Sequence, residues 1–264
     1  MRIPIYQVDA FTDKPFAGNP AAVCLLEAWP EDSLLQAIAA ENNLSETAFL
    51  VKREKSYELR WLTPVAEVDL CGHATLASAY VIFNHVDPAL HNVTFDTRSG
   101  ELSVRREGDL LCMDFPALPA APCACPAALL DGLGIQPGEV LRSTKYLAVF
   151  DTEEEVRMLQ PNMDALKKLD LMGVIVTAKG TTVDFVSRFF APKVGVPEDP
   201  VTGSAHCVLT PYWAQRLDRN KLHARQISLR GGDLYCELLG DRVVISGRAA
   251  MFLKGEITLG LVNE

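Results

Sequence analysis

Residues 60–77 read RWLTPVAEVDLCGHATLA, and residues 188–208 read RFFAPKVGVPEDPVTGSAHCV. The second stretch repeats the first in altered form. Its RFFAP matches the RWLTP of the first at an offset of 128 residues, and its TGSA matches CGHA at an offset of 131. Each stretch contains a glycine, Gly72 or Gly203, shortly before an apolar run. Self-similarity of this kind indicates a structural unit that occurs twice in the chain.

Two further matches follow in the same order. Residues 98–102 (RSGEL) return as residues 230–234 (RGGDL), and the Gly-Asp pair at 108 returns at 240, both at an offset of 132. Near-constant offsets close to half of the 264-residue length predict an internal duplication with two similar lobes. We place the lobes at residues 1–115 and 116–254, because the Pro/Ala-rich stretch 116–126 is typical of a linker.

Hydrophobic periodicity predicts the same order of elements in each lobe. The expected segments are strands 3–8, 21–26, 47–52 and 58–62, helices 31–41 and 74–84 and hairpins over 93–115, then strands 146–150, 174–178 and 183–190, helices 164–169 and 205–217 and hairpins over 226–244. Pro30, Glu31 and Asp32 form a helix start signal, and Asn42 and Asn43 form a stop signal. The helix over 74–84 is apolar almost all round, which is typical of a buried helix. We therefore predict an α+β fold in which each lobe wraps a mainly antiparallel sheet around a central helix.

The composition favours a folded protein without a nucleic-acid or membrane surface. Hydrophobic residues make up 48% of the chain and charged residues 22%, which is typical of globular proteins. The formal net charge is -9, whereas nucleic acids and anionic membranes require clustered Lys and Arg. No apolar stretch approaches the ~18 residues of a spanning helix, and the first residues lack an apolar signal core. We therefore expect a cytoplasmic protein.

No motif implies a cofactor or a metal. Gly132 and Gly134 lack the third glycine and the preceding strand of a dinucleotide-binding fingerprint. Cys123 and Cys125 lack the further His or Cys ligands of a metal site. The seven cysteines show no framework spacing, which suits reduced thiols. We expect no cofactor and no metal.

Both central helices are expected to begin at a glycine, Gly72 in the first lobe and Gly203 in the second. A helix N-terminus presents unpaired N–H groups and a partial positive charge, and glycine allows a ligand to approach this backbone closely. Either glycine alone is better explained by the turn from strand to helix. Matching positions in two repeats favour a shared carboxylate-binding site between the lobes.

The chemistry is sought where the two halves differ. Glu46 stands at the entrance of a strand, and the matching stretch of the second half has no acid. Burial would raise the pKa of such a carboxyl and suit it to general acid/base catalysis; the alternative is an ordinary solvated glutamate. His73 either protonates a substrate or bonds the helix start. Asp199 either acts on the substrate or complements the helix dipole, and Cys71 is either a reactive or an inert thiol.

Six short motifs run along the chain. They are VDAF (8–11), FAGNP (16–20), NLSETA (43–48), LCGHAT (70–75), DPVTGSA (199–205) and QISLRGG (226–232). Together they resemble the PhzF-like family of phenazine biosynthesis over almost the whole chain. The resemblance implies the diaminopimelate-epimerase-like fold and a homodimer. It also implies that the last strand, near 256–262, crosses back so that residues 255–264 complete the first lobe.

The best understood activity of that family is the isomerisation of a dihydro-hydroxyanthranilate, in which a proton moves along an unsaturated ring without a cofactor. By resemblance, Glu46 removes and returns the proton, and His73 and Asp199 help to bind the substrate and to manage protonation. Donors to the substrate carboxylate are implied at Gly72, Gly203 and Ser204, with Asn19 and Ser45 nearby.

We therefore predict an isomerase that moves a proton in a small carboxylate-bearing substrate. Related epimerases use two cysteines that face each other; Cys71 matches the first, and Thr202 stands in the place of the second. A racemase or epimerase that uses Cys71 alone is the alternative enzyme. A ligand-binding or interaction protein without catalytic activity is the alternative from another class.

Overall fold

The computed structural model describes residues 1–260 and divides into two compact units. Unit 1 contains Met1–Asp114 together with the chain from Ser246 onward, and unit 2 contains Phe115–Ile245. The lobes predicted from sequence ended at 115 and 254, so the second boundary of the structure lies earlier than the predicted one. The reason is the length of the last strand, which begins at Ala249.

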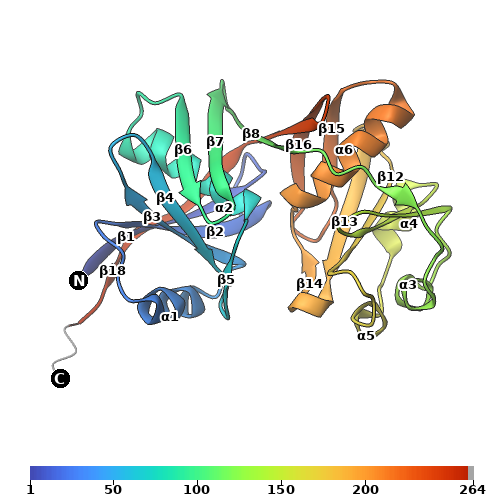
Figure 1. Ribbon diagram of the computed structural model, residues 1–264, viewed down its shortest axis with the longest axis horizontal. Coiled ribbons are helices and arrows are strands. Elements are labelled where there is room, and N and C mark those ends of the chain that lie inside the picture. The colour runs from blue at the N-terminus through green and yellow to red at the C-terminus, as the bar shows by residue number, and fades with distance from the viewer. Residues whose placement is uncertain (261–264) are drawn as a thin grey trace. The chain divides into compact units, whose positions relative to one another are not determined.

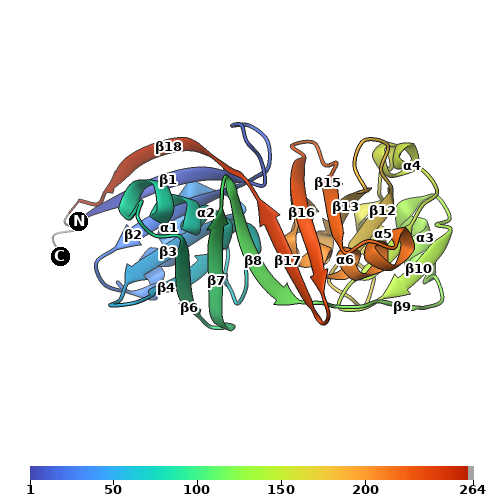
Figure 2. The same cartoon turned by 90° about the horizontal axis from the view of Figure 1, so that it is seen from above.

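Unit 1 is a strongly curved sheet with one helix inside it and one outside it (Figures 1 and 2). Its elements are β1 (Arg2–Ala10), β2 (Asn19–Leu26), α1 (Asp32–Asn42), β3 (Glu46–Lys52), β4 (Tyr57–Leu62), β5 (Glu67–Val68), α2 (Gly72–Val81), the π-helical turn η1 (Ile82–Val86), β6 (Asn92–Thr97), β7 (Gly100–Glu107), β8 (Leu110–Pro116) and β18 (Ala249–Thr258). Strand β1 pairs antiparallel with β18 and β2, β2 pairs parallel with β3, β3 antiparallel with β4, and β4 parallel with β6.

The two helices of unit 1 differ because their sequences differ. In α1, Leu35, Ile38 and Ala39 recur at helical spacing, and this single apolar face packs on the sheet. The predicted stop signal is confirmed, since Asn43 ends α1 in the left-handed conformation and its N–H bonds Ala39 O. Helix α2 is buried along almost its whole length and contacts β1, β2, β3, β7 and β18. It is the predicted central helix.

Strand β18 runs beside β1 from one end to the other, red beside blue in Figure 1. Arg2 pairs with Thr258 and Ala10 with Ala249, with a bulge between Gln7 and Val8. The strand expected near 256–262 was therefore placed too late, and residues 261–264 lie outside the described part. Most β18 side chains from Phe252 onward are exposed, so hydrophobic periodicity carries little signal for this strand, which the backbone of β1 holds.

Unit 2 contains β9 (Ala121–Pro122), α3 (Ala127–Leu133), β10 (Glu139–Arg142), β11 (Tyr146–Val149), α4 (Glu153–Met158), α5 (Met163–Leu166), β12 (Val174–Lys179), β13 (Phe185–Ala191), the 3-10 turn η2 (Pro192–Val194), β14 (Val196–Asp199), α6 (Gly203–Leu217), β15 (Lys221–Gln226), β16 (Gly232–Leu239) and β17 (Arg242–Gly247). Strand β10 pairs antiparallel with β11, β11 parallel with β12, β12 antiparallel with β13, and β13 parallel with β15.

The short helices of unit 2 were predicted incompletely. Helix α5 ends at Leu166 rather than at 169, and α3 and α4 were not predicted. The three helices have seven, six and four residues, and at these lengths hydrophobic periodicity does not distinguish a helix from a loop. Helix α4 carried an overlooked signal, the capping box of Thr152 and Glu155. The predicted linker 116–126 also holds β9, which pairs with β10.

The α+β fold class is confirmed, with mainly antiparallel pairing around a central helix in each unit. Each unit shows the same order of pairings, antiparallel, parallel, antiparallel and parallel, before its closing hairpins. A duplicated chain would produce this order, and the duplication stays our interpretation of it. Among residues 1–260, no helix has the length and apolar character needed to cross a membrane.

Candidate active site

The first group of predicted site residues lies in unit 1, where two strands and the central helix begin. Asn19 opens β2 and Glu46 opens β3, and the parallel pairing of these strands sets Glu46 opposite Ala21. His73 follows Gly72 in the first turn of α2. Three elements therefore bring their first residues to one place, as expected of polar groups gathered at the ends of buried elements.

These residues form a connected polar chain. Ser45 Oγ donates to Asn19 Oδ1 at 3.3 Å, and Asn19 Nδ2 lies 3.2 Å from His73 Nδ1. On the other side of the ring, His73 Nε2 lies 3.1 Å from Glu46 Oε2. This contact joins the carboxylate to the imidazole and is an ion pair when His73 is protonated. One ring nitrogen of His73, Nδ1, thus contacts an amide, and the other, Nε2, contacts a carboxylate.

The Asn19 side chain can serve both charge states of His73. An amide N–H donates to a neutral Nδ1, and after a flip the amide oxygen accepts from a protonated Nδ1–H. Ser45 tolerates the same flip, because a hydroxyl both donates and accepts. This arrangement suits a histidine whose charge changes during a reaction.

Glu46 is ionised at rest, and this corrects the sequence-based expectation. Burial acts to raise the pKa of Glu46, but the charge and hydrogen bonding of His73 outweigh burial and hold the pKa below its usual value. Only 19% of the Glu46 side chain is exposed. Neither alternative drawn from the sequence describes Glu46, because it is neither solvated nor raised in pKa, and the neighbouring imidazole was not considered. A carboxylate in this state can accept a proton but has none to donate.

Cys71 is a thiol at neutral pH. Its Sγ lies 3.5 Å from His73 Nδ1, but burial, together with the charge of Glu46, raises the pKa of Cys71 to about 11. Burial lowers the pKa of His73, and charge on Cys71 and Glu46 raises it, with a net rise. Because the Cys71 thiol carries no charge near neutral pH, Glu46 is the partner that favours a protonated His73 there.

The conformation of the loop before Asn19 is fixed by one hydrogen bond from a side chain and by two residues with positive φ. Asp9 Oδ2 accepts the Phe16 N–H at 2.9 Å across the β1–β2 turn. Phe16 and Gly18 both adopt positive φ, +71° and +66°, so the chain turns sharply just before it enters β2. A Cβ at Gly18 would lie 2.1 Å from Ala10 O, which only glycine avoids. The FAGNP motif therefore places Asn19 beside His73.

Glu46, Cys71 and His73 offer ligand atoms within 4.8 Å of one another, a spacing that a metal ion could bridge. Carboxylate, thiolate and imidazole are ligands that zinc accepts. The thiolate form is disfavoured here because the pKa of Cys71 is raised to about 11, and His73 Nδ1 already faces Asn19. The trio therefore fits the polar chain described above better than it fits a metal.

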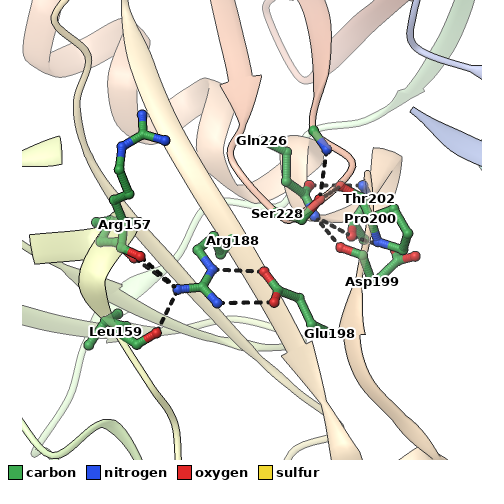
Figure 3. Close-up of polar contacts among 11 residues, drawn as sticks. Arg157, Leu159, Arg188, Glu198, Asp199, Pro200, Thr202, Gln226 and Ser228 are labelled. Atoms are coloured by element: carbon green, nitrogen blue, oxygen red, sulfur yellow. Dashed lines mark hydrogen bonds and ion pairs between the residues drawn. The ribbon is translucent and has the colours of Figure 1, made fainter. Parts of the chain in front are cut away.

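The second group of predicted site residues lies in unit 2, at the start of α6, and Figure 3 shows Asp199 of this group. Asp199 ends β14, and Gly203 and Ser204 open α6. Thr202 precedes Gly203 and is a residue type that usually caps a helix, yet its side chain makes no cap. Its hydroxyl instead donates to Asp199 Oδ2 at 2.5 Å. The start of α2 also lacks a side-chain cap among residues 1–260.

Gln226 is buried at the end of β15 and forms hydrogen bonds with the turn between β14 and α6. Its Nε2 donates to Asp199 O at 2.7 Å and to Thr202 Oγ1 at 3.2 Å, and its Oε1 accepts the Thr202 N–H at 2.9 Å. Sequence reasoning assigned no role to Gln226 or to the Thr202 hydroxyl. A signal existed, because Leu222, Ala224 and Gln226 alternate on the buried side of β15.

The eight predicted site residues thus fall into two groups by unit. Unit 1 brings together Asn19, Ser45, Glu46, Gly72 and His73, and unit 2 brings together Asp199, Gly203 and Ser204. That both groups line one cleft stays a prediction.

Comparisons with known proteins agree over nearly the whole chain. The model of the PhzC-PhzF family, phenazine biosynthesis-like protein, matches residues 8–255. An uncharacterized isomerase of Pseudomonas aeruginosa is 58% identical over 259 residues, covering 98% of this chain and 100% of the relative. The crystal structure of a PhzF-family protein from Enterococcus faecalis has a TM-score of 0.96 and 48% identity, covering 98% and 100%. A hydroxyproline epimerase from Agrobacterium vitis, with a TM-score of 0.62 and 10% identity over 97% and 92%, shares the fold.

Proposed function

This chain belongs to the PhzC-PhzF family of phenazine biosynthesis-like proteins, as the motifs predicted, and we propose that it moves a proton within a small carboxylate-bearing molecule without a bound cofactor. Relatives that are named isomerases, together with neighbours of the epimerase fold, support an isomerase or epimerase. The proton shift, and Glu46 as the group that carries it, are our proposal.

The observation that carries the proposal is the state of Glu46. The carboxylate is largely buried and is ionised because of His73, whose Nε2 lies 3.1 Å from Glu46 Oε2. A buried carboxylate that is already charged is suited to act as a general base. A substrate C–H placed at this carboxylate would meet a base that needs no prior deprotonation.

In the proposed reaction the same residue, Glu46, removes the proton and returns it. Glu46 takes a proton from a substrate carbon, and the electron pair of that C–H bond stays in the substrate, delocalised over its unsaturated system. Glu46 then returns the proton to a different carbon and is again a carboxylate. His73 stabilises the charged form of Glu46 before and after the transfer. No oxidant or second substrate is required.

The substrate carboxylate is assigned to the uncapped helix starts. At α6, the Thr202 side chain makes no cap, and a Cβ added at Gly203 would meet no atom within 4 Å. The N–H groups of Gly203 and Ser204 have no side-chain cap from Thr202, and the helix dipole favours an anion beside them. The start of α2 at Gly72 offers the same chemistry in unit 1.

A racemase that uses Cys71 is the second candidate, because the thiol lies 3.5 Å from a histidine nitrogen. Its raised pKa of about 11 argues against it, since a thiol at neutral pH is a poor base for a C–H bond. A binding protein without catalysis is the candidate from another class.

Deuterium wash-in separates the three. The purified protein is incubated in D₂O with a dihydro-hydroxyanthranilate, with other unsaturated carboxylic acids and with α-amino acids including hydroxyproline, and C–H exchange is followed by NMR. We expect exchange at a carbon of an unsaturated acid. Glu46→Gln should lower the exchange rate by ~10²-fold or more, because it removes the base but preserves size.

Cys71→Ser is the control, and its rate should stay within about threefold of the wild type. Equal rates for Glu46→Gln and the wild type would remove Glu46 from the mechanism. A loss confined to Cys71→Ser would establish the racemase, and a protein that binds these acids but exchanges none would be a binder.

A further inference from the structure

We propose that Gln226 is a positioning residue for Asp199, and that it acts by directing the Thr202 hydroxyl onto the Asp199 carboxylate. The inference rests on the proposed function, in which Asp199 takes part in substrate binding and protonation. Gln226 is fully buried, at 0% exposure, and its amide contacts the turn between β14 and α6 through three hydrogen bonds (Figure 3).

The orientation of the Gln226 amide follows from its partners. A backbone N–H can only donate, so the atom facing Thr202 N at 2.9 Å is the amide oxygen. A backbone carbonyl can only accept, so the atom facing Asp199 O at 2.7 Å is the amide nitrogen. Because each end of the amide meets a group of fixed character, a flip would break both bonds.

The locked amide then fixes the direction of the Thr202 hydroxyl. The second N–H of Gln226 Nε2 points to Thr202 Oγ1 at 3.2 Å, so the hydroxyl oxygen accepts there. Its own hydrogen is free to donate to Asp199 Oδ2, at 2.5 Å. A hydroxyl that donates in this way favours the ionised carboxylate. The same hydrogen bond draws the Thr202 side chain away from capping α6, which leaves the helix start open for the substrate.

A second clamp holds β14 one residue earlier. Arg188 on β13 binds Glu198 through two parallel hydrogen bonds, of 2.7 and 3.0 Å, and its third nitrogen donates to Leu159 O at 2.8 Å. The guanidinium thereby fixes the strand that carries Asp199 to the loop after α4. Arg188 thus holds strand β14 in place, and Gln226 holds the turn between β14 and α6.

Other charged groups lie on the elements beside this turn. Lys193 of η2 donates to two carbonyls, Leu169 O and Asp170 O, and the ring of His206 on α6 bonds Thr202 O. Arg225 on β15 pairs with Asp233, and Arg230 lies in the loop that follows β15. None of these groups is changed in the variants below. A difference between the two Thr202 variants therefore reports the altered hydrogen bond, whereas Gln226→Glu also adds a carboxyl group beside Asp199.

The test compares Thr202→Val with Thr202→Ser. Valine keeps the shape and removes the hydroxyl, whereas serine keeps the hydroxyl. Thr210→Val is the matched control, because Thr210 is also buried on α6 but donates to its own helix, to His206 O at 2.6 Å. Gln226→Glu replaces the donating amide by an acceptor that competes for the Thr202 hydrogen, and Gln215→Glu adds the same charge at an exposed position of α6.

Two readouts are used. Carbon-13 NMR of protein labelled at the aspartate carboxyl carbon follows the titration of Asp199 without any substrate, with Asp199→Asn identifying the signal. Deuterium exchange into the active acid follows turnover as a function of pH. In Thr202→Val and Gln226→Glu we expect the Asp199 titration and the acid limb of the exchange rate to move to higher pH, and exchange at neutral pH to fall about tenfold.

Thr202→Ser, Thr210→Val and Gln215→Glu should titrate like the wild type. If Thr202→Val and Gln226→Glu also titrate like the wild type, the proposal is overturned. A shifted titration with unchanged exchange overturns it as well, because Asp199 would then be held without consequence for turnover. If Gln226→Glu does not fold, the comparison of Thr202→Val with Thr202→Ser still tests the proposal. A wild type that exchanges no acid contradicts the proposed function, and the titration still decides the hydrogen-bond lock.

Discussion

At the scale of single residues, burial and neighbouring groups set the protonation states of three buried side chains, His73, His206 and Cys71. His73 and His206 are both buried in the first turn of a central helix, but His73 faces a carboxylate and His206 faces only a backbone carbonyl. The pKa of His73 is raised, and burial lowers the pKa of His206 to about 4. Cys71, beside His73, stays protonated because burial raises its pKa to about 11. The residue type indicates which chemistry is available, and the surroundings decide which is used.

His206 predicts a pH dependence of stability. Its pKa in the folded protein is about 4 and its ordinary value is 6.5, so the unfolded chain binds more protons between these two values. This stability is fully present above about pH 6.5 and is lost as the pH falls toward 4, to a total of about 3 kcal/mol. The free energy of unfolding from urea titrations at pH 7.5 and 5.0 measures it.

His206→Gln keeps a donor for Thr202 O without a titratable ring, so it should lose less stability than the wild type over the same pH change. Because the Glu46–His73 pair is present in both proteins, its own titration cancels in the comparison. Equal losses in the two proteins would mean that His206 is protonated without cost in the folded state.

At the scale of elements, the sharp turn that leads into β2 determines where Asn19 lies. Gly18→Ala would place a Cβ 2.1 Å from Ala10 O, a backbone atom that cannot move aside, at a φ of +66°. We expect a loss of about 2 kcal/mol or more in the free energy of unfolding, measured by chemical denaturation.

Gly108→Ala is the matched control for this turn. Gly108 has nearly the same φ, +62°, but a Cβ there would meet no atom within 4 Å. It should cost only the left-handed conformation, about 1 kcal/mol. If both variants lose the same amount, the contact with Ala10 is unimportant and the backbone conformation alone matters.

At the scale of the whole molecule, the two units repeat interactions as well as topology. Arg60 binds Glu67 through two hydrogen bonds, as Arg188 binds Glu198, and in both units the clamp precedes the central helix. These shared clamps support the interpretation of a duplication. The units differ at Glu46, which has no acidic counterpart in unit 2. Assembly into a homodimer stays a prediction, which light scattering of the purified protein can check.

The completion of unit 1 by β18 predicts that the two ends of the chain fold together. A chain that ends at Gly247 removes β18, the antiparallel partner that spans the full length of β1, and leaves β2 paired with Ile5–Ala10. We expect cooperative loss of unit 1, measured by thermal denaturation and circular dichroism. A chain that ends at Gly260 keeps β18 and should melt like the full protein. A Gly247-terminated chain with an unchanged melting curve would show that β1 is stable without β18.

The sequence by itself determined the fold class, most of the longer elements, the glycine starts of both central helices and the family, because periodicity, caps and motifs are local properties of the chain. It also identified Glu46, His73 and Asp199 as candidates. The tertiary structure decided the rest. Whether Glu46 is ionised, where the Thr202 hydroxyl points and which strand pairs with β1 depend on residues distant in sequence, such as His73, Gln226 and β18. Their effects arise from burial and from distances of about a hydrogen bond's length, which exist only after the chain has folded.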